Sequence, residues 1–189
     1  MLKRQKALQV GEYHASKSPL ILHTILGSCV AVCLFDPVQR IGGMNHILMP
    51  GAMDLKKFDM SARYGINAME LLINRIMRLG GDRSRLQAKL FGGAHLFPSI
   101  PENNSIGKRN AVFSRDFLKK EGIKILNADL GGHATRKIFF HTDTGKVFLK
   151  RTYSTHYKQI AEVEMRQLER MSKKFKKLSD VTLFNVSST

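Results

Sequence analysis

The sequence predicts an α+β domain that is rich in strands and has two helices packed against a sheet or sandwich. Two patterns point to this class: short apolar segments bounded by Gly, Pro and Asp turns, and longer segments whose apolar residues recur at three and four. The helices are expected at residues 61–79 and 107–120. The strands are expected at residues 20–24, 30–35, 41–48, 86–91, 123–128, 137–142 and 146–151.

The first block of the chain contains three of these strands. Gly27-Ser28 joins the first strand to the second, and Asp36-Pro37 forms the turn that ends the second. Asp143-Thr144-Gly145 turns the last two strands into a hairpin. The block is therefore expected to be a compact β-rich unit.

Each helix is expected to bury one face. Gly80-Gly81 ends the first helix and Gly122 ends the second. The residues expected in the core are Met69, Leu72, Ile73, Ile76 and Leu79 from the first, and Phe113, Phe117 and Leu118 from the second.

The pattern changes beyond about residue 155, which divides the chain into a domain over residues 1–154 and a basic amphipathic helix and tail over residues 155–189. Such a helix either docks on the core or stays free for an acidic partner or a membrane surface, and the apolar stripe favours docking. The stripe is Ala161, Met165, Leu168, Met171, Phe175 and Leu178. The charged face is Lys158, Glu162, Glu164, Arg166, Glu169, Arg170, Lys173, Lys174, Lys176 and Lys177.

Composition excludes several classes of protein. No segment approaches the roughly 18 apolar residues of a membrane span, and no apolar run follows the basic start. Cys29 and Cys33 would lie about 13 Å apart on a strand, too far for a disulfide. Reduced thiols favour the cytoplasm.

The charge is the outlying property. Lys and Arg number 31 against 15 Asp and Glu, which gives +16. Such a balance favours nucleic acid, anionic lipid or an acidic protein surface as partner. Nucleic-acid binding is the weaker alternative, because no helix-turn-helix, zinc-finger or RNA-recognition pattern is visible and Trp is absent.

One cluster of residues could carry chemistry. Cys29 follows Gly27-Ser28 at the head of a strand, where a thiol can be exposed beside backbone N–H groups that hold an oxyanion. A thiol needs a base to react at neutral pH, and His46 is the candidate, with Thr24 placed to orient it. The alternatives are a buried core cysteine, as expected for Cys33, or a zinc site, which the spread of the two thiols along a strand disfavours.

Seven blocks of sequence carry a family resemblance, of which Leu26-Gly27-Ser28-Cys29 and Gly42-Gly43-Met44-Asn45-His46 are the most specific. In this order they resemble the CheD family of chemoreceptor glutamine deamidases. The blocks are residues 11–13, 24–34, 42–46, 48–50, 92–94, 106–110 and 131–132.

The resemblance implies hydrolysis of glutamine side chains to glutamate on methyl-accepting chemotaxis receptors, with release of ammonia. It maps a catalytic set onto Cys29, His46 and Thr24, and because the Thr-to-Cys spacing is one residue longer in some members, His23 competes with Thr24. Ser28, Gly27 and Asn45 are expected to shape the site and its oxyanion position.

The resemblance also implies a fold and partners. The fold is a mixed β-sandwich with flanking helices, similar to toxin-type cysteine deamidases. The substrates are the cytoplasmic domains of chemoreceptors, and a phosphatase of the CheC type is a further partner. No metal or cofactor is needed, and no nucleic acid is expected. A docking protein without activity is the alternative, against which the presence of Cys29 and His46 argues.

Overall fold

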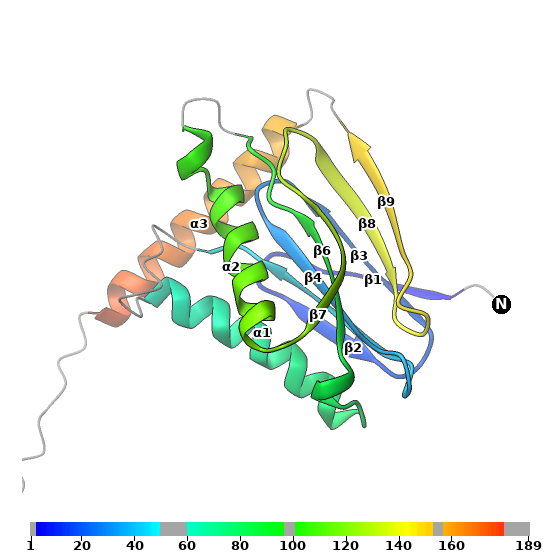
Figure 1. Ribbon diagram of the computed structural model, residues 1–189. Coiled ribbons are helices and arrows are strands. Elements are labelled where there is room, and N and C mark those ends of the chain that lie inside the picture. Colours follow the sequence, from blue (N-terminus) through cyan, green and yellow to red (C-terminus); the bar gives the residue numbers. More distant parts are fainter. Residues whose placement is uncertain (1–2, 50–59, 97–100, 153–156, 180–189) are drawn as a thin grey trace, which may run out of the picture.

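A computed structural model of the protein describes residues 3–49, 60–96, 101–152 and 157–179. Two mixed β-sheets pack face to face, with helices outside them (Figure 1). The four-stranded sheet has the order β1 (Arg4–Ala7), β3 (Leu20–Leu26), β8 (Thr135–His141), β9 (Val147–Thr152). The five-stranded sheet has the order β2 (Tyr13–Ser16), β5 (Ile41–Ile47), β4 (Val30–Asp36), β6 (Gln87–Gly92), β7 (Lys124–Leu130).

Both sheets contain parallel and antiparallel pairs. β1 pairs with β3 in parallel, as β6 does with β7, and the other neighbours are antiparallel. The predicted α+β class and mixed β-sandwich are therefore confirmed.

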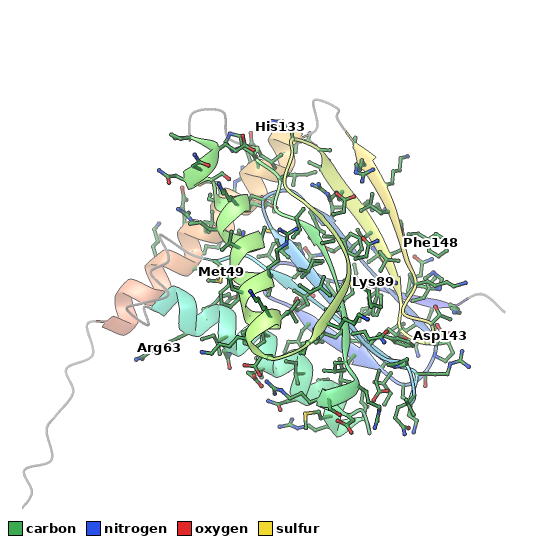
Figure 2. The ribbon with its side chains drawn as sticks, in the orientation of Figure 1. Met49, Arg63, Lys89, His133, Asp143 and Phe148 are labelled. Atoms are coloured by element: carbon green, nitrogen blue, oxygen red, sulfur yellow. The ribbon has the colours of Figure 1, made fainter. Side chains whose placement is uncertain are left out.

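The helices are α1 (Met60–Arg78), α2 (Ile106–Lys120) and α3 (Tyr157–Ser179), with short 3₁₀ turns at η1 (Arg83–Arg85) and η2 (Glu102–Asn104). α1 and α2 cover one face of the five-stranded sheet, and the four-stranded sheet covers the other (Figure 1). Side chains lie between the two sheets and between the five-stranded sheet and the helices (Figure 2). The two predicted helices are confirmed, and their expected core residues are buried except for Leu79, which is partly buried.

β4 shows why residues 30–35 form an unbroken apolar run. Val30, Val32 and Leu34 pack toward α1 and α2. Ala31 and Cys33 point into the space between the sheets. A strand covered on both faces needs apolar residues at every position.

α3 packs on the body of the domain through its first half. Ala161 is buried beside Ala94 and Leu96, and Leu168 joins the cluster between the sheets. This agrees with the docked alternative for the apolar stripe, whereas the side chains of Phe175 and Leu178 lie outside the described residues. The division of the chain at residue 154 stays a prediction. None of the helices, over the part of the chain that is described, is long and apolar enough to cross a membrane.

Candidate active site

Cys29 lies in the three-residue link between β3 and β4, and its side chain is fully buried. The carbonyl groups of the link are all held by the scaffold. Gly27 O accepts from the Ala94 N–H at 2.8 Å, and Cys29 O accepts from the Gly93 N–H at 2.7 Å. Ser28 O accepts from Nδ2 of Asn110 on α2, also at 2.8 Å. The position of the thiol is therefore fixed from three sides.

Glycine allows this close packing at two positions. Gly92 has φ +112°, and a Cβ there would lie 2.1 Å from Cys29 O. A Cβ on Gly107 would lie 2.4 Å from the carbonyl oxygens of Gly93 and Ala94. A side chain at Gly92 would push the turn at residues 92–94 away from the cysteine link, and one at Gly107 would push α2 away from that turn.

The N–H groups of the same link all point to one carboxylate. Oε1 of Glu164, on α3, accepts from the N–H of Gly27 at 3.0 Å and of Cys29 at 3.2 Å. Oε2 accepts from the Ser28 N–H at 2.8 Å and from the Ser28 hydroxyl at 2.6 Å. Successive N–H groups converging in this way form an anion-binding nest, and the N–H groups of residues 27–29 are called the nest below.

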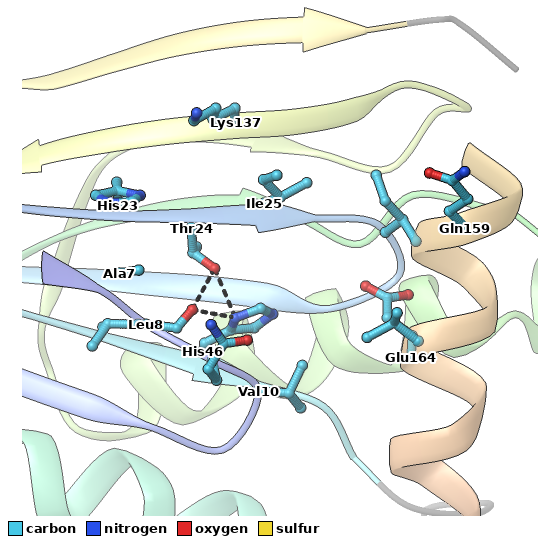
Figure 3. Close-up of a pocket in the computed structure, with 13 residues that line it drawn as sticks. Ala7, Leu8, Val10, His23, Thr24, Ile25, His46, Lys137, Gln159 and Glu164 are labelled. Atoms are coloured by element: carbon cyan, nitrogen blue, oxygen red, sulfur yellow. Dashed lines mark hydrogen bonds between the residues drawn. The ribbon is translucent and has the colours of Figure 1, made fainter. Parts of the chain in front are cut away.

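His46 lies on β5 with its ring buried between the sheets. Its Nδ1 is 2.9 Å from Oγ1 of Thr24 on β3, and the Thr24 hydroxyl donates its single proton to Leu8 O at 2.8 Å (Figure 3). The Leu8 carbonyl can only accept, and it also lies 3.4 Å from Nδ1, so all three contacts are satisfied when Nδ1 carries the proton and Thr24 accepts from it. Nε2 is left with its lone pair, and it is buried without a hydrogen-bond partner among the residues that the structure describes.

The structure brings Cys29, His46 and Thr24 to the same face of their sheets. Leu22 and Leu26 flank Thr24 on that face of β3, and Met44 precedes His46 in the same way on β5. Cys29 belongs to the same cluster between the sheets. Side chains two residues apart on a strand share a face, so all three residues face the space between the sheets, and Thr24 and His46 are in direct contact.

His23 and Asn45 lie on the opposite faces of those strands. The His23 ring stacks against Phe139 with 5.7 Å between centroids, away from His46. Thr24, rather than His23, is therefore the residue in contact with His46.

Asn45, which was expected to help shape the site, makes its described contacts with β4 and α1. Its Oδ1 accepts from the Val32 N–H at 3.1 Å, and its Nδ2 donates to Ala68 O at 3.3 Å. Asn45 joins β4, β5 and α1 on the helix side of the sheet, because it alternates with His46 along β5.

The site holds neutral groups in this arrangement. Burial raises the pKa of the Cys29 thiol well above its usual value, and the adjacent Glu164 carboxylate raises it further. Burial lowers the pKa of the His46 imidazole, although the Leu8 carbonyl and two carboxylates oppose the change. The thiol therefore remains protonated and the imidazole neutral at neutral pH.

A pocket of about 340 Å³ leads to His46 between the four-stranded sheet and α3 (Figure 3). Thr24, His46 and Glu164 line it, whereas Cys29 does not. The Glu164 side chain extends from α3 toward the sheets (Figure 3). The wall on the helix side is formed by Gln159, Ile160, Val163 and Glu164.

Sequence reasoning missed three groups that contact the site residues. Glu164 was assigned to the charged face of its helix, but it is only 2% exposed, three residues after Ala161 and four before Leu168. That spacing is the signal that could have placed it on the buried side. Asn110 belongs to the resemblance block at residues 106–110, but no role was predicted for it. Nothing in the sequence indicates that the Leu8 carbonyl contacts Thr24.

Tyr64 on α1 is a further neighbour of the thiol. Burial raises the pKa of Tyr64, and the charge that Cys29 carries as a thiolate raises it further.

Both cysteines are free thiols. Among the described side chains, no group of three His, Cys, Asp or Glu could hold a metal ion.

Comparison with known proteins places the chain among relatives. A family model described as "CheD chemotactic sensory transduction" matches residues 48–151. Among solved structures, hypothetical protein YfiH of Bacillus licheniformis superposes with a TM-score of 0.39 at 16% identity, over 62% of this chain and 49% of that one.

Curated relatives are much more similar. The "Probable chemoreceptor glutamine deamidase CheD" of Laribacter hongkongensis is 42% identical over 163 residues, which cover 85% of this chain and 79% of the relative. The "Probable chemoreceptor glutamine deamidase CheD 2" of Chromobacterium violaceum is 46% identical over 142 residues, which cover 75% of this chain and 70% of the relative. The chain therefore belongs to the CheD family.

Proposed function

We propose that this protein hydrolyses glutamine side chains to glutamate in the cytoplasmic part of chemoreceptors, with Cys29 as the nucleophile. The observation that carries the proposal is the nest at the nucleophile, together with an imidazole whose free nitrogen is Nε2. The names of the relatives, "chemoreceptor glutamine deamidase", support the same reaction and substrate.

The proposed reaction proceeds through a thioester. Nε2 of His46 takes the proton of the Cys29 thiol, and the thiolate attacks the carboxamide carbon of the substrate. The nest holds the oxyanion, for which one such donor is typically worth about 3 kcal/mol. The C–N bond breaks as His46 returns the proton to the departing ammonia.

Water completes the cycle. It loses a proton to Nε2 and adds to the thioester carbon. The C–S bond then breaks, the Cys29 sulfur takes the proton back from His46, and the new acid loses its remaining proton to solvent and leaves as the carboxylate. Thr24 holds Nδ1–H throughout, so that Nε2 is the nitrogen that exchanges protons.

The test is incubation of the purified chain with a receptor cytoplasmic fragment, followed by measurement of ammonia and of the mass of the fragment. Cys29→Ala should abolish both signals and keep the fold. Cys33→Ala is the matched control, because its thiol is buried on the same face of the sheet without contact to the nest. It should stay active and lose about 1 kcal/mol of stability. Ammonia release by Cys29→Ala would exclude the covalent mechanism.

A second candidate is a docking protein that binds receptors or a CheC-type phosphatase without catalysis. The observation in its favour is that Glu164 fills the nest and the thiol is buried. Binding of the receptor fragment with no ammonia from any variant would support this alternative.

A further inference from the structure

Glu164 is a buried carboxylate that is held by hydrogen bonds to the nest. It accepts four, three from the nest and one from the Ser28 hydroxyl, at 2.6–3.2 Å. No Lys, Arg or His forms a salt bridge with it within the part of the chain that the structure describes. Burying an unpaired carboxylate is costly, so a site built for anions must compensate for it.

The chemistry of the site identifies what Glu164 imitates. Deamidation turns a glutamine carboxamide into a glutamate carboxylate on the same carbon. The product of the reaction is thus a glutamate side chain whose oxygens face the donors that held the oxyanion. Glu164 is such a side chain in that position, beside the nucleophile.

The rest of α3 supports this placement. Ala161, one turn before Glu164, is small and buried, which lets the helix approach the link at residues 27–29. Leu168, one turn after, is buried between the sheets. A Cβ on Gly27 would lie 3.0 Å from both Glu164 oxygens and 2.5 Å from Leu96, so the link also leaves room for the carboxylate.

We propose that α3 is a built-in analogue of the reaction product, with Glu164 held where the glutamine of a substrate binds. This inference rests on the proposed function. α3 must leave the site before a receptor can enter, and helix and receptor therefore compete for the nest.

The first test measures competition in the full-length chain. Glu164→Ala removes the carboxylate and should lower the KM for a receptor fragment while leaving kcat within about twofold. If α3 leaves the site open a tenth of the time, the expected decrease in KM is about tenfold. Glu162→Ala is the control, because Glu162 lies on the same helix with its side chain 67% exposed.

A second measurement reports access to the thiol. Alkylation of Cys29 by iodoacetamide should be at least several times faster in Glu164→Ala than in the native chain or in Glu162→Ala. Cys33 serves as the internal reference, because it is buried between the sheets and should remain slow in all three proteins.

The sharpest test turns the analogue into a substrate. In Glu164→Gln, the thiolate of Cys29 can bond to the amide carbon of residue 164 and release ammonia, which takes its proton from His46. Water then adds to the thioester, breaks the C–S bond and restores glutamate at position 164. Peptide mass spectrometry should show this conversion, whereas the matched Glu162→Gln keeps its amide. A Cys29→Ala, Glu164→Gln double variant should also keep its amide.

The outcomes separate the two proposals. A Glu164→Gln chain that keeps its amide while it deamidates the receptor fragment would overturn the inference and leave the proposed function standing. A Glu164→Ala chain that melts normally but has a lower kcat would also overturn it, because Glu164 would then help to build the site. Failure of every variant to release ammonia from the receptor fragment would overturn both.

Discussion

The contact between Thr24 and Nδ1 of His46 favours a tautomer in which Nε2 is free to act as the proposed base. The Thr24 hydroxyl donates to Leu8 O and so can only accept from Nδ1. A side chain of the same shape without the hydroxyl would leave the ring free to exchange its tautomer.

Thr24→Val should therefore lower kcat, but by less than the roughly 10²–10⁴-fold loss expected for His46→Ala. The measurement is steady-state ammonia release. His23→Ala is the neighbouring control and should keep its activity, because His23 lies on the other face of β3 against Phe139. If only His23→Ala were inactive, His23 rather than Thr24 would be the residue that orients the imidazole.

Substitutions at Gly92 and Gly80 distinguish the effect of backbone strain from the effect of a clash with Cys29. Both glycines have left-handed φ, +112° and +100°, but a Cβ on Gly80 meets nothing within 4 Å. Gly80→Ala should lose about 1–2 kcal/mol of stability from strain and keep its activity.

Gly92→Ala should lose more stability and also activity, because its Cβ displaces the Cys29 carbonyl. Thermal melts and ammonia release measure the two effects. Equal stability and activity in the two variants would show that the contact with Cys29 does not position the thiol.

Residue identity predicted part of the site, and strand alternation decided the rest. Cys29, His46 and Thr24 could be selected from residue chemistry and family resemblance. Adjacent residues such as Asn45 and His46 point to opposite faces, so their roles depend on which face meets the second sheet. Glu164 was predicted to be a charged surface residue, because its contact with the nest depends on how α3 packs in the folded chain.

At the scale of elements, the main strands and helices could be predicted, whereas β1 and β2 could not. Both have only four residues and lie at the edges of their sheets, and every residue of β1 is exposed. Such strands lack the apolar alternation that reveals a half-buried strand. The segment between them nevertheless supplies the Leu8 carbonyl to Thr24.

Asp36 ties the end of β4 to η1. Its buried carboxylate accepts from the N–H groups of Val38, Gln39 and Asp82 at 2.9–3.1 Å and pairs with Arg85 at 2.9 Å. Burial alone would raise the pKa of Asp36, but the Arg85 contact and the three N–H groups lower it to about 2 from an ordinary 3.8. The carboxylate therefore stabilises the folded state.

A lowered pKa means that this stabilisation is present above about pH 4 and is lost as the pH falls toward 2. Asp36→Asn should cost about 2 kcal/mol at pH 7. Denaturant unfolding of both proteins at pH 7 and pH 2.5 measures the difference, which should shrink at the lower pH. A difference that does not change with pH would show that the cost comes from shape or hydrogen bonding rather than from charge.

At the scale of the molecule, the net charge of +16 predicts how the protein meets its substrate. If the receptor surface is acidic, affinity should fall as salt rises, because the Debye length shortens from about 10 Å at 0.1 M to about 3 Å at 1 M. Titration of a receptor fragment at several salt concentrations measures this dependence. A flat response would favour another use of the charge, and a DNA shift assay would then test the nucleic-acid alternative.

The assembly of the whole molecule was less predictable than its parts. The parallel pairs β1–β3 and β6–β7 and the contact of α3 with the cysteine link join segments that are separate in the sequence. Local patterns predict an element and its buried face but not the element that covers that face. The sequence of α3 therefore fits both a docked and a free helix, and the contacts of Ala161, Glu164 and Leu168 show the docked one.

The covalent connection of α3 to β9 has a quantitative consequence for any assay. A competitor that belongs to the same chain acts at an effective concentration that does not depend on the concentration of the protein. Dilution therefore does not free the nest of Glu164, whereas it does reduce the concentration of a soluble receptor fragment. If Glu164 competes with substrate as proposed, assays at micromolar substrate should underestimate turnover, and receptors at high local density should displace α3 more readily.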